Sequence, residues 1–360
     1  MAKSISVLVV DDSAFMRKIL TDILESDNEI KVAATAKDGR EALEKVRTVS
    51  PDVITLDVEM PAMDGLTCLK ELQKITDVPV IMLSGLTTSG AKATIESLEA
   101  GAIDFITKPT GLFDIAGEAK KKEIIEKIRM AKSVRRKVSR AIRAETARVE
   151  PVRPVVRTDR ESKRSTELKT LVAIGTSTGG PKALQEVIPY IPGDIPAAVV
   201  IVQHMPPGFT KSLADRLNTL SDLSVKEAEH DEVIKPGYAY IAPGDYHMEV
   251  QKTAKGVLKI KLTQEPPVGG HRPAVNVMMD SVAETGFRKV IGVIMTGMGA
   301  DGSKGIVNIK NSNKGVIISQ DEKSCVVYGM PKSAVNTGVV DEVVPLKDIA
   351  EVIVKYLGVE

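Results

Sequence analysis

Three aspartates stand where two apolar runs of the sequence end. Asp11 and Asp12 follow the run at 7–10, and Asp57 follows the run at 53–56. If these runs are neighbouring parallel strands, the three carboxylates converge at one sheet edge and repel one another unless a hard divalent cation lies among them. Oxygen ligands and retained waters suit Mg2+. A carboxylate bound to such a cation can also attack a phosphoryl group. The pattern therefore predicts Asp57 as a phosphate acceptor and a metal site at Asp11, Asp12 and Asp57.

A hydroxyl and an ammonium group are predicted at the same edge. Ser84 closes a third apolar run, at 78–83, and Lys108 follows a fourth, at 103–106. The lysine would bring its charge to the phosphoryl oxygens. Between the runs, segments such as 13–24 show apolar residues at helical spacing. Strand and helix alternate five times in about 125 residues, which indicates a doubly wound parallel α/β sheet.

The N-terminal part of the chain resembles the response-regulator receiver family, from residue 4 to about 128. The resemblance rests on residues at the strand ends and in the loop after the acceptor aspartate: Asp11, Asp12, Asp57, Met60, Pro61, Asp64, Gly65, Ser84, Lys108 and Pro109. It implies a (βα)5 receiver with a flavodoxin-like sheet and phosphorylation of Asp57 in the presence of Mg2+. It also implies that Ser84 and Lys108 form the switch that senses the phosphoryl group.

The composition limits the number of domains and the classes of partner that the chain can have. A chain of 360 residues is long for one domain, and 43% hydrophobic residues allow two ordinary cores. The net charge of +1 gives no global indication of nucleic-acid or membrane binding. Cys68 and Cys325 suit a reducing compartment, and the apolar run near the N-terminus is too short to cross a bilayer. We expect a cytoplasmic protein that does not insert into membranes.

A basic segment separates the two predicted domains. From Lys132 to Arg164 the sequence has twelve Lys and Arg residues against four Asp and Glu, with almost no apolar periodicity. This pattern predicts a helix that extends to about Arg148 and a linker after it. The basic charge fits a solvated tether, and it also fits binding of an acidic partner or nucleic acid. The predicted divisions are a receiver, a basic extension with linker, and a second domain: 1–128, 129–168 and 169–360.

The second domain begins with a strand and a glycine-rich turn. The apolar run at 171–174 leads into Gly175, Ser177 and Gly179, and a helical pattern with Pro181 in its first turn follows. Free N–H groups of a helix start point at such a turn, so it could hold a phosphate. The spacing Gly-Xaa-Ser-Xaa-Gly also matches a nucleophile elbow, in which a serine is raised on a sharp turn. A tight structural turn without chemistry is the third possibility.

A serine nucleophile needs a base, and the chain has four histidines. His204 follows the apolar run at 198–203, at the carboxyl end of the strand expected beside that of Ser177. His204 is therefore the predicted base. The other histidines lie in polar or glycine-rich segments, the first expected in solvent and the last two possible cleft residues: His230, His247 and His271.

A carboxylate is then required to orient the imidazole. The apolar run at 290–294 ends in a glycine-rich loop that contains Asp301. We predict that Asp301 takes this role and that N–H groups of the loop help to form an oxyanion hole. Asp301 could also cap the helix expected after it. Because the order Ser, His, Asp differs from that of α/β-hydrolases, a distinct hydrolase on a Rossmann-like sheet is indicated.

Over essentially its full length the chain resembles the chemotaxis protein-glutamate methylesterase (CheB) family. The order of receiver, basic linker and effector matches, and so do three motifs: 174–180, 203–206 and 296–302. The resemblance implies a catalytic triad of Ser177, His204 and Asp301. It assigns the oxyanion to the backbone N–H groups of Thr178 and Met298.

The same resemblance implies the substrate and the partners. The substrates would be glutamate methyl esters on methyl-accepting chemotaxis receptors, together with specific receptor glutamines that are deamidated. The phosphodonor would be the chemotaxis histidine kinase. Ester hydrolysis would need no metal, so Mg2+ would serve the receiver alone. One residue departs from the family: Ala300 replaces a more usual polar residue, which should alter the polarity of the loop more than its chemistry.

Functions of two other classes are left open. A response regulator that binds DNA through the basic linker would have a small helical output module and a steep salt dependence of binding. A nucleotide-binding module would use the turn at 175–180. The strand–helix pattern of residues 170–360 disfavours the first function. The glycine spacing disfavours the second, since it is neither that of a dinucleotide site nor that of a Walker loop.

Overall fold

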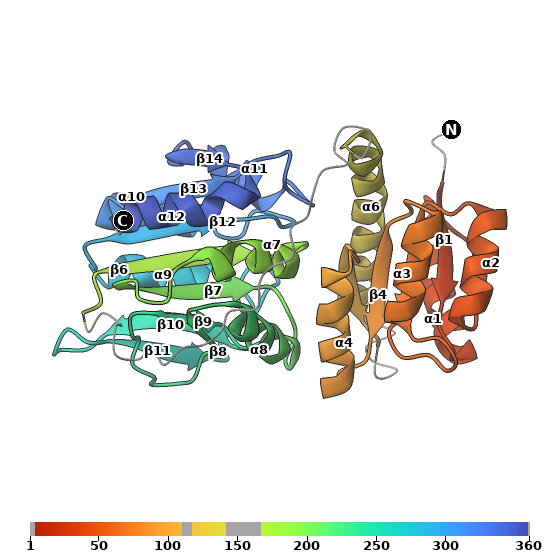
Figure 1. Cartoon of the computed structure of the whole chain (residues 1–360), viewed down its shortest axis with the longest axis horizontal. Helices are drawn as coiled ribbons and strands as arrows, with labels where there is room; N and C mark the ends of the chain where they lie inside the picture. Colours follow the sequence, from red (N-terminus) through yellow and green to blue (C-terminus); the bar gives the residue numbers. More distant parts are fainter. Residues whose placement is uncertain (1–3, 110–116, 142–166, 359–360) are drawn as a thin grey trace. The chain divides into compact units, whose positions relative to one another are not determined.

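The computed structural model describes residues 4–109, 117–141 and 167–358. The chain divides into two compact units, Met1–Pro151 and Val152–Glu360. Each unit is built on a parallel sheet with helices on both faces (Figure 1). The α/β fold predicted for both parts of the chain is confirmed.

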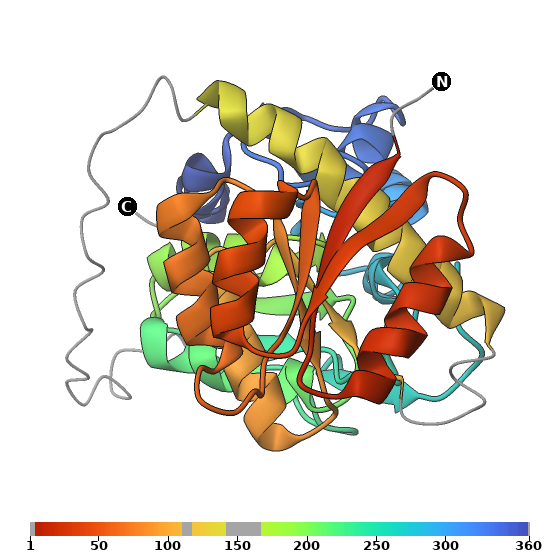
Figure 2. The ribbon, with the colours of Figure 1, turned by 90° about the vertical axis from the view of Figure 1, so that its right-hand side faces the viewer.

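The first unit alternates strand and helix along the chain. Its elements are β1 (Ile5–Val10), α1 (Ala14–Glu25), β2 (Ile30–Ala36), α2 (Gly39–Val49), β3 (Val53–Asp57), α3 (Gly65–Ile75), β4 (Val80–Ser84), α4 (Thr88–Glu99), β5 (Asp104–Thr107) and α6 (Glu118–Ala141). The strand order is β2-β1-β3-β4-β5, and each neighbouring pair is parallel. Helices α1 and α6 contact each other on one face, and α2, α3 and α4 follow one another on the other (Figure 2).

Local chemistry explains where these elements begin. The central strands β1, β3 and β4 are apolar runs buried on both faces, as a parallel sheet between two helix layers requires. Helices α1 to α4 each start after a side chain that accepts a hydrogen bond from a free N–H group of the first turn: Ser13, Asp38, Asp64 and Thr87. These caps end the loops at the carboxyl edge of the sheet and thus fix the loops in which the predicted site residues lie.

Helix α6 bears on the predicted domain boundary. It runs without a break across residue 128 to Ala141, and the buried Ala131 belongs to the same apolar core as Ile124 and Ile128. The helical start of the predicted basic extension is thus present. Residues 142–166, on which the rest of the predicted helix and the linker fall, lie outside the described residues. The predicted divisions at 128 and 168 therefore stay predictions.

The second unit has a larger parallel sheet. Its elements are β6 (Thr170–Thr176), α7 (Gly180–Val187), η2 (Ile188–Tyr190), β7 (Ala197–Gln203), α8 (Phe209–Leu220), β8 (Ser224–Glu227), β9 (Tyr238–Ile241), β10 (His247–Lys252), β11 (Leu258–Thr263), α9 (Val275–Glu284), β12 (Val290–Ile294), α10 (Ser303–Asn313), β13 (Val316–Gln320), α11 (Met330–Val335), β14 (Glu342–Val344), η3 (Leu346–Asp348) and α12 (Ile349–Leu357). The strand order is β14-β13-β12-β6-β7-β9-β8, and β10 and β11 form a separate antiparallel hairpin.

The order of the central strands creates a crevice. From β6 the chain winds outward through β7 on one side, and it later returns to place β12 on the other side of β6. The loops after β6 and β12 therefore diverge at the carboxyl edge, which is where ligands bind in open α/β sheets. Beneath this edge, α9 packs against the β10–β11 hairpin and shares an apolar core with β6 and β7.

A glycine next to the phosphoacceptor gives the first prediction. A Cβ added at Gly65 would lie 2.1 Å from the backbone oxygen of Asp57, whereas at Gly85 the nearest atom would be 4.0 Å away. We expect Gly65→Ala to destabilise the first unit by about 1–3 kcal/mol, the usual cost of overpacking. Gly85→Ala is the matched control and should change stability by less than about 0.5 kcal/mol. Hydrogen exchange of the β3 amides in the full-length chain measures both, and equal exchange in the two variants would contradict the close contact.

Candidate functional site

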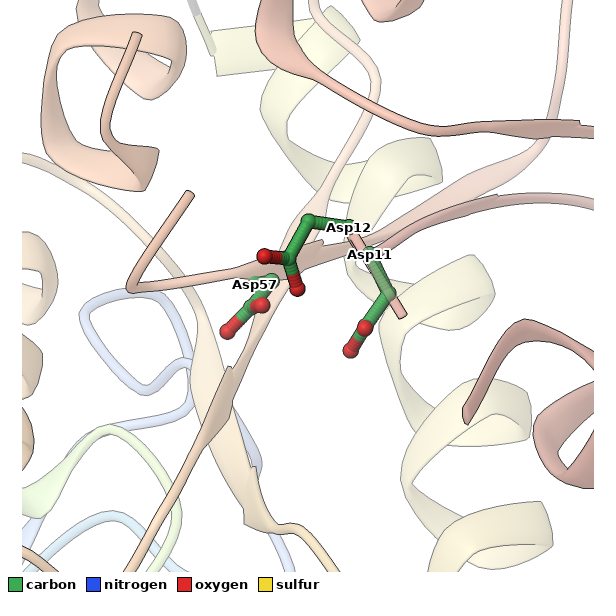
Figure 3. Close-up of side chains that lie close together, drawn as sticks. All are labelled: Asp11, Asp12 and Asp57. Atoms are coloured by element: carbon green, nitrogen blue, oxygen red, sulfur yellow. The ribbon is translucent and has the colours of Figure 1, made fainter. Parts of the chain in front are cut away.

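The three predicted carboxylates converge at the ends of β1 and β3. Oxygens of Asp11, Asp12 and Asp57 all lie within 4.8 Å of one another (Figure 3). Asp11 and Asp57 are buried, and Asp12 is exposed. The register explains the meeting, because Val10 of β1 pairs with Leu56 of β3 directly before the aspartates. Three carboxylates at this spacing are a donor set that suits a hard divalent cation.

Lys108 joins two of these carboxylates. Its Nζ lies 2.9 Å from Asp11 Oδ2 and 2.7 Å from Asp57 Oδ2. Burial alone would lower the pKa of Lys108, but the two carboxylates outweigh this effect and raise it, so the ammonium stays charged. Burial raises the pKa of Asp57 to about 6; Lys108 opposes this shift, and the negative charge of Asp11 adds to it. Asp57 is thus a basic carboxylate held beside a fixed positive charge.

Ser84 lies at the same edge, as predicted. It ends β4, one residue after Leu83, which pairs with Asp57 in the sheet. The side chain is buried, and its hydroxyl donates to the carbonyl of Gly85 at 3.2 Å. The backbone N–H of Lys108 donates to the carbonyl of Ser84 at 2.8 Å. The two predicted switch residues are therefore linked through the backbone.

The loops that carry Ser177, His204 and Asp301 also meet, at the carboxyl edge of the second sheet. They follow the strands β6, β7 and β12, which are neighbours in that sheet. The N–H of Ser177 donates to the carbonyl of Thr296 at 3.0 Å, in the loop after β12. The N–H of His204 donates to the carbonyl of Thr176 at 3.2 Å. Backbone hydrogen bonds between the strand ends thus bring the three loops together.

The pair of His204 and Asp301 defines which imidazole nitrogen can act as a base. His204 Nε2 lies 2.8 Å from Asp301 Oδ2, and only 7% and 8% of the two side chains are exposed. An ionised carboxylate only accepts hydrogen bonds, so Nε2 carries the proton and Nδ1 keeps its lone pair. Among the described residues, Nδ1 is buried and has no hydrogen-bond partner. It is the nitrogen available to a serine hydroxyl.

The start of α9 holds the Asp301 carboxylate. The N–H groups of Val275 and Asn276 donate to its two oxygens at 2.6 and 2.9 Å, and the N–H of Gly302 donates at 2.9 Å. Burial alone would raise the pKa of Asp301, but the hydrogen bond and charge of His204, together with the N–H groups of Asn276 and Val275, hold it below its ordinary value. Asp301 therefore stays ionised and cannot take the proton from the imidazole.

Asp301 caps a different helix from the one considered as an alternative in the sequence analysis. It precedes α10, but it caps α9, and α10 is capped in return by the side chain of Asn276. The Asn276 Oδ1 accepts hydrogen bonds from Gly302 and Gly305 at 3.1 and 3.0 Å. The two helix starts thus satisfy each other's free N–H groups. Sequence reasoning missed Asn276, and the only signal for it was an amide residue near the start of an apolar helix.

A buried polar network lies beneath Ser177, and sequence reasoning missed it as well. Thr296 is its centre: its hydroxyl donates to the carbonyl of Thr178 at 3.0 Å, and its N–H donates to the side chain of Gln320 at 2.7 Å. The side-chain amide of Gln203 donates to the carbonyl of Ser177 at 3.0 Å. These bonds fix the carbonyls of the elbow on the side away from the crevice. The signal for the glutamines was a polar side chain closing an apolar run.

The two predicted oxyanion residues flank Ser177. Thr178 follows Ser177 in the turn that leads to α7, and it is buried. Met298 lies in the loop after β12 and is 38% exposed. The backbone of this loop approaches the serine closely, since a Cβ at Gly297 would lie 2.9 Å from Ser177 Cβ and 3.1 Å from its nitrogen.

The other histidines fall into three environments. The ring of His271 stacks on that of His204, with a centroid distance of 3.8 Å and an interplanar angle of 10°. His247 is buried and is hydrogen-bonded through both ring nitrogens. His230 is 58% exposed, as expected. Of the two possible cleft residues, His271 therefore touches the candidate base and His247 does not face solvent.

The structure defines a class of protein: a receiver-type α/β unit followed by a larger α/β unit with a Ser-His-Asp cluster. Comparison with known proteins agrees with this class. A family model described as "CheB methylesterase" matches residues 172–353, and one described as "Response regulator receiver domain" matches residues 7–119.

Relatives match over the full length of the chain. A protein-glutamate methylesterase/protein-glutamine glutaminase of Pyrococcus horikoshii is 50% identical over 359 residues, which are 100% of this chain and 95% of the relative. One from Syntrophomonas wolfei is 46% identical and covers 98% of this chain and 99% of the relative. The crystal structure of the Thermotoga maritima CheB methylesterase catalytic domain is 46% identical, with a TM-score of 0.50, over 53% of this chain and 97% of that domain.

The chain therefore belongs to the CheB methylesterase family and carries a response regulator receiver domain. Both resemblances are confirmed, and the protein is an ester hydrolase under the control of receiver phosphorylation. A small helical DNA-binding output module is excluded, because residues 170–357 contain the seven-stranded sheet and its helices. Within the described residues, no helix is both long and apolar enough to cross a membrane.

The lowered pKa of Asp301 gives the second prediction. A carboxyl group whose pKa is depressed in the folded state stabilises the fold above its unfolded value of 3.8 and loses this contribution as the pH falls through the folded value. We expect Asp301→Asn to cost about 1–3 kcal/mol between pH 5 and 8, because three N–H donors lose a charged acceptor. The cost should shrink below about pH 4.

The free energy of unfolding of Asp301→Asn should be compared with that of the parent from about pH 3 to 5, below the range in which an imidazole ordinarily titrates. His204 is kept in both proteins, because its hydrogen bond and charge are the main causes of the lowered pKa of Asp301. A cost that stays constant or grows as the pH falls through about 4 would contradict a depressed pKa.

Proposed function

We propose that this protein removes methyl groups from glutamate methyl esters of methyl-accepting chemotaxis receptors, with Ser177, His204 and Asp301 as its catalytic triad. The observation that carries the assignment is the buried 2.8 Å pair of His204 and Asp301, which leaves Nδ1 of His204 unpartnered among the described residues beside the elbow of Ser177. The names of its full-length relatives support the substrate, and they also support deamidation of receptor glutamines.

The reaction proceeds in two halves. Ser177 Oγ attacks the ester carbonyl carbon while Nδ1 of His204 takes the hydroxyl proton. The bond to the methoxy oxygen then breaks, and the imidazolium returns the proton, so methanol leaves. Water attacks the acyl-enzyme with His204 again as the base, and Ser177 and a free glutamate result. Asp301 keeps the proton on Nε2 and stabilises the imidazolium throughout. The same steps release ammonia when the substrate is a glutamine amide.

The oxyanion is assigned to the backbone N–H groups of Thr178 and Met298. Thr178 directly follows the nucleophile Ser177. Met298 directly follows Gly297, whose backbone lies next to Ser177. The approach of Gly297 to within van der Waals distance of Ser177 supports a donor from each side of the reacting carbon. Loss of one such donor typically costs about 100-fold or more in rate. In this proposal, ester hydrolysis uses these side chains and backbone groups and needs no metal.

In the receiver, Asp57 is assigned as the phosphoryl acceptor. Asp11, Asp12 and Asp57 would hold Mg2+, which when bound offsets charge on the phosphoryl group. Asp57 attacks the phosphorus of the phosphodonor, the bond between phosphorus and the donor breaks, and the donor leaves. Lys108 supplies a second positive charge to the phosphoryl oxygens. Ser84, at the next strand end, is placed to respond to the modified residue. The phosphodonor is assigned as the chemotaxis histidine kinase. We also assign the protein to the cytoplasm, because the two cysteines form no disulfide.

The nucleophile gives the third prediction. We expect Ser177→Ala to lower the rate of methanol release from methylated receptor by at least about 1,000-fold without change in the fold, since no other group replaces the attacking oxygen. His204→Gln should have an effect of similar size. His230→Ala is the control, because His230 is exposed and far from the pair of His204 and Asp301 in the sequence and the sheet. Activity of the Ser177 variant within tenfold of the parent would remove Ser177 from this role.

The acceptor gives the fourth prediction. We expect Asp57→Asn to abolish labelling by a small radioactive phosphodonor, and chelation of Mg2+ to abolish labelling of the parent, because attack needs both the carboxylate and the offset of charge. In the parent alone, phosphodonor and Mg2+ together should change the rate of methanol release. Labelling that survives both treatments would show that the acidic cluster has another purpose.

A further inference from the structure

One short segment contacts both members of the pair of His204 and Asp301. It is the segment 271–276, between the hairpin β10–β11 and the first turn of α9. At its start, His271 stacks on His204, and at its end two N–H groups hold Asp301. Sequence reasoning named His271 as a possible cleft residue and did not give this segment a role. The triad is part of the proposed function, so a role for this segment in catalysis rests on the proposed function as well.

The loop before this segment is folded back on itself. Val268 and His271 exchange two backbone hydrogen bonds, of 3.0 and 3.1 Å, across Gly269 and Gly270. Both glycines have positive φ, of 61° and 85°. Two central residues of positive φ form the tight turn that suits a β-hairpin. We call residues 264–274 the strap. Its tight turn leads directly into the histidine that stacks on the base.

Arg272 ties the strap to the loop before β10. Its guanidinium donates to Asp245 Oδ1 through Nε and Nη2, at 3.1 and 2.5 Å. Its Nη1 donates to the carbonyls of Gln264 and Glu265, at 3.0 and 3.1 Å. The N–H of Asp245 in turn donates to the carbonyl of Arg272 at 3.2 Å. The planar guanidinium of Arg272 thus joins the beginning of the strap, the end of the strap and the loop that contains Asp245. A lysine ammonium does not have the geometry to make all of these hydrogen bonds.

His247 holds the strap through both of its ring nitrogens. Its Nε2 lies 3.2 Å from the carbonyl of Pro266, and its Nδ1 lies 3.3 Å from the nitrogen of Ala274. A carbonyl only accepts and an N–H only donates, so Nε2 carries the proton and Nδ1 accepts. This residue is 1% exposed and starts β10, whose Met248 and Val250 lie in the core of the second unit. The strap is therefore fixed at both ends to the rigid part of the domain.

From these contacts we propose that the strap is the positioning device of the catalytic base, with His271 as its contact and Arg272 as its clamp. Asp301 fixes one nitrogen of His204 and leaves the ring free to tilt about that hydrogen bond. A flat ring stacked at 3.8 Å removes this freedom. It therefore aims Nδ1 at the hydroxyl of Ser177. Neither strap residue donates or accepts the transferred proton, and both act through His204.

Two substitutions of His271 separate the effect of stacking from that of proton transfer. His271→Phe keeps a flat ring and cannot exchange protons, whereas His271→Ala removes the ring. We expect His271→Ala to lower kcat about 10- to 100-fold with little change in KM, because a misplaced base slows the chemical step. His271→Phe should recover most of this loss. Arg272→Lys should lower kcat in the same way, and adding it to His271→Ala should cost little more, since both act through one contact.

The experiment uses full-length protein and two readouts. Initial rates with p-nitrophenyl acetate and methanol release from methylated receptor give kcat and KM. The imidazole Nε2–H resonance of His204 reports the ring directly and without turnover. It should be sharp in the parent and in His271→Phe, and broad or shifted in His271→Ala. Arg288→Ala, which alters an exposed arginine before β12, and His230→Ala are the controls and should match the parent.

Each outcome decides the matter. If His271→Ala keeps the parental kcat and resonance, or if His271→Phe is as impaired as His271→Ala, the strap does not position the base by stacking. If His271→Ala fails to fold, the comparison of Arg272→Lys with Arg288→Ala serves in its place, and equal kcat in these two overturns the proposal. Full activity of Ser177→Ala would instead overturn the proposed function itself, while the resonance would still report whether the strap orders the ring.

Discussion

The carboxylate of Asp301 is the point on which the arrangement of the hydrolase site depends. It accepts hydrogen bonds from His204 and from the N–H groups of Val275, Asn276 and Gly302. Only an ionised acceptor satisfies so many donors at once, and the positive end of α9 favours that ionised state. The same group thus sets the tautomer of the base, begins α9 and orders the turn into α10. Because these tasks share one side chain, the site cannot loosen locally without loss of the helix packing around it.

Close packing around this carboxylate requires residues without a Cβ. A Cβ at Gly175, at the end of β6, would lie 2.3 Å from Val275 Cγ1, and one at Gly302 would lie 2.8 Å from the same atom. Gly302 also has φ of 92°, in the region that favours glycine. These two glycines allow the start of α9 to approach both β6, which leads to Ser177, and the loop that carries Asp301. Gly175, in the turn for which the sequence left phosphate binding open, is explained here by the approach of helix to strand.

The sequence predicted the parts of the site that are properties of single strand ends. Asp57 and Ser84 in the first sheet, and Ser177 and His204 in the second, each end or follow an apolar run. Parallel strands carry their carboxyl ends to one edge, so the meeting of each pair of loops within its own sheet could be expected. The stack of His271 on His204 and the capping of α9 by Asp301 could not. They depend on how the β10–β11 hairpin and the strap fold back across the sheet, and nothing in the local spacing of these residues encodes that path. The capping of α9 by Asp301 was missed for the same reason, since the alternative considered for Asp301 was the nearest helix in sequence.

Two buried aspartates of the chain have opposite pKa shifts, and their surroundings explain why. Burial alone would raise the pKa of both carboxyl groups. At Asp57 it prevails, because Lys108 is shared with Asp11, the neighbouring Asp11 is itself negative, and one N–H, that of Glu59, donates at 3.2 Å. At Asp301 the imidazole and three N–H donors prevail instead. A carboxylate that keeps its basicity can attack phosphorus, whereas one saturated with donors can only orient a neighbour. The number of hydrogen bonds that each carboxylate accepts thus explains why Asp57 suits attack on phosphorus in the first unit and Asp301 suits orientation of His204 in the second.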